Sequence, residues 1–309
     1  MINIVGIGAN VYDTLVTLPC YPDEDTKMRA SEIKVSGGGP CATGLTAASR
    51  LGESTAFLGC LSDDAASRFL ADDFEKYGVS REYIVSEPGY QAFTSYIWLS
   101  EKTVSRTCVF DKGNIPPLVL NEKQKQGIQK AKMLMVDGNE LSAAIEGAAL
   151  ARKSGTKVLY DAGGLYSGIA SLLPMADYLI PSQEFALGYT GAESAEEAAK
   201  KLFAQYQPRV VVITQGKEGG ILFDGETVSA YPAFPVSAVD SNGAGDVFHG
   251  AFAFAVVRGM DYYKACVFSS AVSAIKCTRL GARQGVPAYE EVIQFLKERG
   301  YHEFEKNME

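Results

Sequence analysis

Two aspartates flank a glycine-rich turn in the segment DSNGAGDVFHGAF, residues 240–252. The residues from Asp246 onward are apolar on every side, which predicts a buried helix that stops at Arg258 and Gly259. The glycines before this helix leave its first amides unobstructed, and those amides and the helix dipole favour a negative charge. Asp246 is then either an ordinary helix cap or a general base beside a phosphate-binding loop. His249, one turn later, is interpreted as a packed side chain.

Three further segments could bring bare backbone close to a ligand. The stretch VSGGGPCATGLTAASRLG, residues 35–52, suits either a polyhydroxylated ligand or a tight turn before a closely packed helix. The stretch VVITQGKEGGILF, residues 211–223, is either a phosphate-binding turn or a simple hairpin. In residues 269–287, small residues could take an adenine ring and loop carbonyls a monovalent cation, although loop termination explains the pattern equally well.

The N-terminal stretch VGIGANV carries Gly6 and Gly8 at the spacing of a dinucleotide-binding turn. The third glycine position holds Val11, and no helix follows cleanly. A plain strand end is the favoured interpretation, and a NAD-dependent dehydrogenase is kept as a third hypothesis.

Short apolar runs alternate with helical patterns along the chain. The runs INIVGI, TAFLGC, KMLMVDG, KVLYDAG, ADYLIPS and RVVVITQG are too continuously apolar for one-faced strands and suit a parallel sheet covered on both faces. Between them, helices are predicted over residues 40–51, 63–77 with Ser62 as the cap, 140–154 and 193–206. The alternation predicts a doubly wound, mostly parallel α/β sheet.

Two segments depart from this rhythm. Residues 11–36 look like a pair of alternating strands, and residues 92–110 read as a hairpin around Ser100–Thr103. We expect the two excursions to pair into a small β lid, with bounds 11–36 and 90–112, on a single domain spanning residues 1–309.

The bulk composition limits the class of protein. The chain has 309 residues, 47% of them hydrophobic, and a formal net charge of −8. This charge argues against a nucleic-acid surface, although a local pocket can still bind an anion. The first residues lack the pattern of a signal peptide and no run has the length of a membrane span, so a soluble cytoplasmic protein without a membrane partner is expected.

Taken together and in this order, the motifs resemble those of the ribokinase-like (PfkB) carbohydrate kinases over essentially the whole chain. GGGPCATGLTAASRLG looks like the family's N-terminal glycine signature, and DSNGAGD looks like its C-terminal signature. The resemblance implies a ribokinase-like α/β fold with a small β-sheet lid, and phosphorylation of a sugar hydroxyl by ATP with Mg²⁺.

The resemblance also implies roles for individual positions in phosphoryl transfer. Asp246 would be the base, with the amides of Gly243, Ala244 and Gly245 as the anion hole. The nucleotide would be contacted by Thr214, Gly216, Gly219, Ser270, Ala271 and Ala274. The family's potassium site would involve Asp240 and loop carbonyls near Cys277 and Ala282.

On the acceptor side, Asp13, Gly37 and Gly38 fall where family members hold sugar hydroxyls. The motifs are most similar to those of the sulfofructose kinase branch. Lys27 matches its sulfonate-contacting lysine, whereas its arginine aligns with Asn139. The acceptor is therefore left open as a ketose, a ketose phosphate, a sulfonated ketose or a related sugar acid.

Two other positions depart from the family pattern. The asparagine that usually follows the glycine signature is Ala42, and the family's N-x-x-E magnesium motif aligns with Ser182 to Phe185. Glu184, or a water held by Gln183, would then substitute at magnesium. The altered motif supports a second hypothesis, a catalytically impaired sugar-binding regulator on the same fold.

A homodimer through the lid is also expected. Its strands carry more apolar surface than a solvated flap needs. The residues concerned are Tyr12, Leu15, Phe93, Tyr96 and Trp98.

Overall fold

The continuously apolar runs of the sequence become neighbouring strands of one large sheet. The structure, a computed structural model, describes residues 1–103, 105–165 and 167–304, and within these residues the sheet has the order β15-β14-β13-β12-β11-β10-β1-β4-β6. In this order every neighbouring pair from β13 to β6 is parallel, and the pairs β13–β14 and β14–β15 are antiparallel, so the predicted doubly wound, mostly parallel α/β sheet is confirmed. The strands are β1 (Ile4–Ile7), β4 (Thr55–Phe57), β6 (Val79–Ser80), β10 (Met133–Val136), β11 (Lys157–Ala162), β12 (Tyr178–Pro181), β13 (Val210–Thr214), β14 (Gly220–Phe223) and β15 (Val228–Tyr231).

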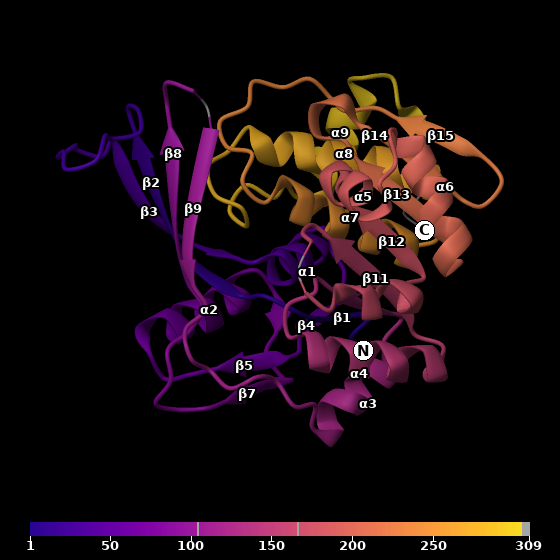
Figure 1. Ribbon diagram of the computed structural model, residues 1–309, viewed down its shortest axis with the longest axis horizontal. Helices are drawn as coiled ribbons and strands as arrows, with labels where there is room; N and C mark the ends of the chain where they lie inside the picture. Colours follow the sequence, from indigo (N-terminus) through magenta and orange to yellow (C-terminus); the bar gives the residue numbers. More distant parts are fainter. Residues whose placement is uncertain (104, 166, 305–309) are drawn as a thin grey trace.

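Helices cover both faces of this sheet (Figure 1). Every residue of β1, β10 and β12 is buried, as expected of strands that are apolar toward both faces. One hydrophobic core lies beneath α1 (Pro40–Arg50), α7 (Ala244–Val257), α8 (Tyr262–Cys277) and α9 (Tyr289–Lys297). The other core lies beneath α3 (Glu122–Lys130), α4 (Leu141–Ser154), α5 (Gln183–Thr190) and α6 (Ala195–Tyr206).

Two local features differ from the sequence predictions, the strand at 55–60 and the cap of the next helix. The run at 55–60 is not one strand. Leu58, whose amide donates to the carbonyl of Gly6, separates β4 from β5 (Gly59–Leu61), and β5 pairs with β7 (Ile84–Ser86) in another sheet. Ser62 does not cap the next helix, α2 (Ala65–Lys76). The cap is Asp64, whose carboxylate accepts a hydrogen bond from the Ser67 amide at 2.8 Å.

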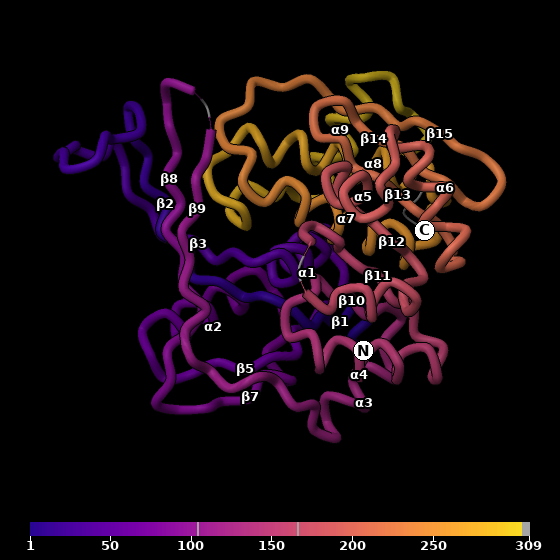
Figure 2. The backbone as a smooth tube through the Cα atoms, viewed as in Figure 1, coloured from indigo at the N-terminus to yellow at the C-terminus, as the bar shows by residue number. Residues whose placement is uncertain are grey.

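The two β excursions form a separate small sheet in the order β3-β2-β8-β9. Its strands are β2 (Val11–Leu18), β3 (Glu32–Gly38), β8 (Thr94–Ser100) and β9 (Ser105–Asp111), which confirms the two predicted strand pairs. The sheet projects from one side of the helical layers, and the loop from β2 to β3 lies at its outer end (Figure 2). Its use as a lid stays a prediction.

Helix α7 is held closely at its middle. Gly44 of α1 and Gly250 of α7 face one another so tightly that a Cβ on Gly250 would lie 2.0 Å from the carbonyl oxygen of Gly44. Only glycine permits this approach of the two backbones, so α1 sets the position of α7.

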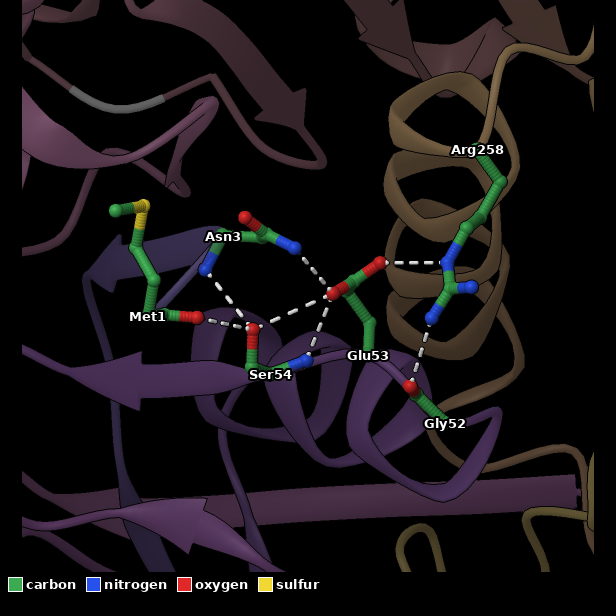
Figure 3. A network of polar contacts seen from close by, with 6 residues as sticks. All are labelled: Met1, Asn3, Gly52, Glu53, Ser54 and Arg258. Atoms are coloured by element: carbon green, nitrogen blue, oxygen red, sulfur yellow. Dashed lines mark hydrogen bonds and ion pairs between the residues drawn. The ribbon is translucent and has the colours of Figure 1, made fainter.

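The far end of α7 is fixed by a polar network (Figure 3). Arg258 donates from Nε to buried Glu53 at 2.8 Å, and Asn3 donates to the other oxygen of Glu53 at 2.7 Å. Contacts at its middle and at its far end therefore fix the position of α7 and of its N-terminus. None of the helices within the described residues combines the length and apolar character needed to cross a membrane.

Candidate active site

The carboxyl ends of the parallel strands meet along one edge of the large sheet, where open α/β sheets bind their ligands. The turn Gly8–Asn10 follows β1, Asp137 follows β10, Asp161 lies near the end of β11 and Ser182 follows β12. The first turn of α7 lies over this edge, because the His249 ring contacts β12 through the carbonyl of Ile180, with Nε2 2.9 Å from its oxygen.

The glycine turn before α7 presents an open helix N-terminus. Gly243 is the N-cap with φ 75°, and a Cβ there would lie 2.6 Å from the Cβ of Ala282, so the position requires glycine. A Cβ on Gly245 would meet no described atom within 4 Å, so the face is clear. The Ala244 amide already donates to the carbonyl of Ser241 at 3.2 Å.

The predicted anion hole therefore needs one correction. The Ala244 amide donates to a carbonyl within the turn, whereas the amides of Gly243 and Gly245 have no acceptor among the described residues. These two donors, at the positive end of the helix dipole, can hold an anion.

Asp246 stands in the first turn of the same helix and is half-buried. Burial raises its pKa to about 7, and the charge of Asp161 adds to the rise, whereas His249 and Arg106 oppose it. A carboxyl group with a pKa near 7 is suited to accept a proton at neutral pH.

His249 is packed beneath Asp246, as the sequence indicated. Its Nδ1 lies 2.6 Å from the carbonyl oxygen of Gly245 and 3.2 Å from a carboxylate oxygen of Asp161. Burial lowers its pKa. The ring therefore connects α7 to β11 and β12 and holds the glycine turn in place.

Sequence reasoning missed Asp137 and Asp161, two buried aspartates at the ends of adjacent strands. Asp137 accepts backbone hydrogen bonds from Ala9 at 2.8 Å and Cys41 at 2.9 Å, and a third from Asn139 at 2.9 Å. It fixes the turn after β1, the start of α1 and the predicted Asn139 together. The usable signal was an aspartate at the end of each apolar run, in MLMVDG and VLYDAG.

A cavity of 360 Å³ lies between this edge and the small sheet. The turn Gly8–Asn10 and Asn139 form one wall, and Phe93 and Lys112 from the lid segments form another. Lys112 is exposed and has no hydrogen-bond or ion-pair partner among the described residues. The cavity thus offers a small polar ligand amide groups, the cation of Lys112 and the carboxylate of Glu140, which accepts from the Leu118 amide at 2.8 Å.

Asn10, also missed from the sequence, is oriented by a buried arginine. Arg283 donates from Nη2 to the Asn10 side-chain oxygen at 2.7 Å and from Nη1 to Asp73 at 2.8 Å. Asn10 Nδ2 is consequently a buried donor without a partner in the described part of the chain. Buried donors without partners are rare, and a ligand in the cavity would satisfy this one.

The predicted sugar-binding glycines lie beside these groups. A Cβ on Gly37 would lie 2.3 Å from both Arg283 and Asp73, and a Cβ on Gly38 would lie 1.9 Å from Asp13. The side chains of Arg283, Asp73 and Asp13 therefore already occupy the space next to these two glycines.

Asp13 and Lys27 have different positions on the small sheet. Asp13 is buried on β2 and accepts from the Ser95 hydroxyl at 2.6 Å, and burial raises its pKa to about 6. Lys27 lies in the exposed loop between β2 and β3, outside the residues that line the cavity. The fold does not bring Lys27 to the other predicted sugar contacts.

The predicted nucleotide turn follows β13. Thr214 ends the strand, and the Gln215 amide donates to the carbonyl of Gly219 at 2.8 Å, which closes a short turn. Gly216 and Gly219 both have positive φ, of 58° and 85°, and a Cβ on Gly216 would meet no described atom within 4 Å. An open turn beside the half-buried Thr214 is compatible with a phosphate contact.

The predicted adenine surface on α8 needs correction. Ala271 has an exposed fraction of 0%, Ser270 and Ala274 are also buried, and the Ser270 hydroxyl donates to the carbonyl of Pro232 at 2.6 Å. Ala271 is therefore a packing residue. The small residues of α8 serve its close contact with α7, where the Ser273 hydroxyl donates to the carbonyl of Ala244 at 2.8 Å.

The predicted metal ligands are partly dispersed. Glu184 is exposed in the first turn of α5, and Gln183 accepts a hydrogen bond from Gln215 at 2.6 Å. The described residues contain no cluster of three or more metal-ligating side chains. Asp240, Cys277 and Ala282 do lie together beside the glycine turn, and the Asp240 amide donates to the carbonyl of Cys277 at 3.1 Å.

A cation from the small sheet completes the surroundings of the glycine turn. A guanidinium nitrogen of Arg106 on β9 lies 3.5 Å from the hydroxyl of Ser241, and both residues line a second cavity of 330 Å³. Sequence reasoning missed it because a strand arginine carries no motif. It lies where a positive charge can act on a bound phosphoryl group.

The dehydrogenase hypothesis fails on local geometry. A Cβ on Gly8 would lie 2.4 Å from the carboxylate of Asp137, and β1 is followed by strand β2 rather than by a helix. The negative charge and the missing helix N-terminus both oppose a dinucleotide pyrophosphate there.

Comparison with known proteins gives consistent results. Residues 3–288 match the sequence model described as "pfkB family carbohydrate kinase". The chain is 25% identical over 297 residues to a ribokinase of Haemophilus influenzae, with 94% of this chain and 97% of the relative covered. It is 28% identical over 316 residues to a 5-dehydro-2-deoxygluconokinase of Clostridium tetani, with 92% and 91% covered.

Solved structures have the same fold. A protein from Agrobacterium tumefaciens, 26% identical, superimposes with a TM-score of 0.90 over 96% of this chain and 98% of its own. A ribokinase of Arabidopsis thaliana, solved with ribose and ATP, is 24% identical and has a TM-score of 0.85 over 96% and 99% of the two chains.

Proposed function

The chain belongs to the pfkB family of carbohydrate kinases, and we propose that it transfers the γ-phosphoryl group of ATP to a hydroxyl of a ketose, ketose phosphate or sugar acid. One observation carries this proposal. A half-buried carboxyl group with a pKa of about 7, Asp246, stands at an open helix N-terminus beside the amides of Gly243 and Gly245, which have no acceptor among the described residues.

In the proposed mechanism, Asp246 accepts the proton of the acceptor hydroxyl as its oxygen attacks the γ-phosphorus. The bond from the γ-phosphorus to the bridging oxygen breaks, and ADP leaves with that electron pair. The amides of Gly243 and Gly245 donate to the phosphoryl oxygens, and their preorganisation favours the transition state. Arg106 adds positive charge from the small sheet.

The nucleotide phosphates would lie toward the turn Thr214–Gly219, which the link between Gln183 and Gln215 connects to α5. Magnesium in kinases is held by one or two carboxylates together with phosphate oxygens. The free carboxylate of Glu184 fits that requirement, and bound magnesium would neutralise charge on the β- and γ-phosphates. Glu184 is the proposed ligand.

The acceptor would lie in the 360 Å³ cavity. Asn10 and Asn139 supply amide groups, and Asp13 is a hydrogen-bond acceptor on β2, the strand that follows Asn10, although it is outside the residues that line the cavity. Lys112, which has no ion-pair partner among the described residues, favours an anionic substituent on the sugar. The similarity to a 5-dehydro-2-deoxygluconokinase supports a sugar acid, and the resemblance to the sulfofructose kinase branch stays a prediction.

A panel of acceptors tests this function. ADP release would be measured with ribose, neutral ketoses, ketose phosphates, sulfonated ketoses and 5-dehydro-2-deoxygluconate, each with a control that lacks the sugar. We expect sugar-dependent ADP release with at least one anionic member. Sugar binding by calorimetry without ADP release from any member would instead support the regulator hypothesis.

The pKa of Asp246 predicts the pH dependence of catalysis. A base must be ionised, and its pKa of about 7 means that half the free enzyme is protonated near neutrality. We expect kcat/KM for the sugar to fall as pH decreases through about 7, because this parameter reports the enzyme form that has not yet bound the sugar. Initial rates at subsaturating sugar and saturating ATP measure it. A flat profile down to about pH 5 would contradict the assignment.

We also propose that two copies associate through the outer face of the small sheet. Four apolar side chains on this face, Ile33, Tyr96, Trp98 and Val109, are exposed, and the strand register places them side by side. Leu15, expected in this contact, is instead buried on the inner face. Light scattering at micromolar concentration should give a dimer, and Trp98→Glu a monomer. A monomeric wild type would exclude this contact.

A further inference from the structure

Lys276 is a fully buried cation at the base of the phosphoryl-binding turn. Its side chain is 0% exposed and donates from Nζ to the backbone oxygen of Asp240 at 2.7 Å. The same ammonium lies 3.7 Å from a carboxylate oxygen of Asp240, whose side chain is 1% exposed. A buried charge needs such a partner, so the two residues form one unit.

This pair organises the turn on both sides. One carboxylate oxygen of Asp240 accepts from the Asn242 amide at 2.8 Å, and the other accepts from the Gly281 amide at 2.9 Å. The residue after Gly281, Ala282, is the one that contacts Gly243. The Lys276–Asp240 pair thus holds the two loops that meet at the proposed anion hole.

Among the oxygen atoms expected to bind potassium, those of Asp240 and Cys277 already accept hydrogen bonds. The carbonyl of Cys277 accepts from the amides of Val239 at 2.7 Å and Asp240 at 3.1 Å. The backbone oxygen of Asp240 accepts from the ammonium, and both its carboxylate oxygens accept from amides. Potassium would need these oxygens and would place a second positive charge beside Lys276. The residues present therefore do not fit a potassium ion.

We infer that the ammonium of Lys276 takes the place of a monovalent cation at Asp240, so that the enzyme organises its phosphoryl-binding turn without potassium. The two ions carry the same charge, and a lysine ammonium is a compact donor of three hydrogen bonds. A covalently attached cation is present at any salt concentration. This inference rests on the proposed kinase function only for its catalytic consequence.

The first test compares salts on the wild-type protein. Rates with the best acceptor of the panel, and thermal unfolding midpoints, would be measured in equal concentrations of potassium, sodium and tetramethylammonium chloride. A cation that binds the folded state raises the midpoint, whereas Lys276 predicts the same midpoint and rates within about twofold in all three salts. A potassium-specific rise in the midpoint, or activation of about tenfold or more, would overturn the inference.

The second test removes the ammonium. Lys276→Met keeps an unbranched side chain one atom shorter and removes the charge, and we expect kcat to fall by about tenfold or more because the turn loses its support. Lys276→Ala leaves space for an ion, and added ammonium or potassium should restore part of its rate. Lys264→Met, on the same helix but at the surface, is the matched control and should keep the wild-type rate.

The outcomes separate the two claims. Wild-type turnover by Lys276→Met in tetramethylammonium chloride would contradict the role of Lys276 while leaving the kinase proposal intact. If no acceptor is phosphorylated, the kinase proposal fails, and the salt dependence of the unfolding midpoint still decides the inference. That measurement also decides it should the Lys276 variants not fold.

Discussion

Replacing Asp246 with asparagine is expected to lower kcat by about 10²- to 10⁴-fold while the affinity for ATP stays near that of the wild type. The amide keeps the shape of the carboxyl group and its place in the first turn of α7. It cannot accept the proton that the acceptor hydroxyl loses, so only the chemical step is impaired. Steady-state kinetics with the best acceptor, together with calorimetric titration of ATP, measure both quantities.

A matched variant is available at the next helix. Asp261 is also an aspartate at a helix N-terminus, where it caps α8 by accepting from the Lys264 amide at 2.8 Å. Asparagine is an equally good cap, so Asp261→Asn should leave both stability and kcat unchanged. Full activity of Asp246→Asn would eliminate Asp246 as the base.

Replacing Arg283 with methionine is expected to lower the free energy of unfolding by about 3–5 kcal/mol, because Asp73 would be left as a buried charge without its partner. Arg283 is 0% exposed, and its guanidinium also bonds to Asn10 and the carbonyl of Gly38. Its loss frees Asn10 to rotate, so KM for the sugar should rise while KM for ATP changes little. Urea denaturation and initial rates give the two readouts.

Arg81 provides the control for this experiment. Its ion pair with Glu75, at 2.6 Å, lies at the surface, where such pairs contribute about 0–1 kcal/mol. Arg81→Met should therefore unfold close to the wild-type midpoint with an unchanged KM for the sugar. Equal stability losses for the two arginine variants would contradict the account of the buried pair.

The features that the sequence predicted well are those that depend only on residues close together in the chain. The buried strand β10 follows from the run MLMV, and Gly155, with φ 88°, ends α4 where the glycine predicted it. The glycine turn and Asp246 are also local, since the helix that carries them begins within the motif. Hydrophobic periodicity and turn propensity depend on residues a few positions apart, so they are sufficient to predict these local features.

The features that escaped prediction depend on contacts between distant residues. Arg283 and Asp73 are 210 positions apart, and Asp137 reaches Ala9 across 128. Nothing near either residue in the sequence indicates the partner. For the same reason Ala271 looked like part of a free small-residue surface, although its exposed fraction is 0%.

Local competition explains the misplaced helix cap. Ser62 and Asp64 are both good caps, but the Ser62 hydroxyl accepts from the Tyr90 amide at 3.0 Å. That contact comes from the segment leading into the small sheet, 28 positions away, and leaves Asp64 to cap α2. Asp64 has a tertiary contact as well, because its other carboxylate oxygen accepts from the Ala92 amide at 3.1 Å, so distant residues that propensity does not report place both candidates.

The most direct test of the central claim follows the fate of the phosphoryl group. Wild-type protein would be incubated with ATP labelled at its γ-phosphorus and with the best acceptor of the panel, and the products separated. The account predicts that the label appears in a sugar phosphate in the same amount as the ADP formed, and that Asp246→Asn loses this product. Label recovered only as inorganic phosphate, or retained in ATP with every acceptor, would contradict the assignment of the chain as a sugar kinase.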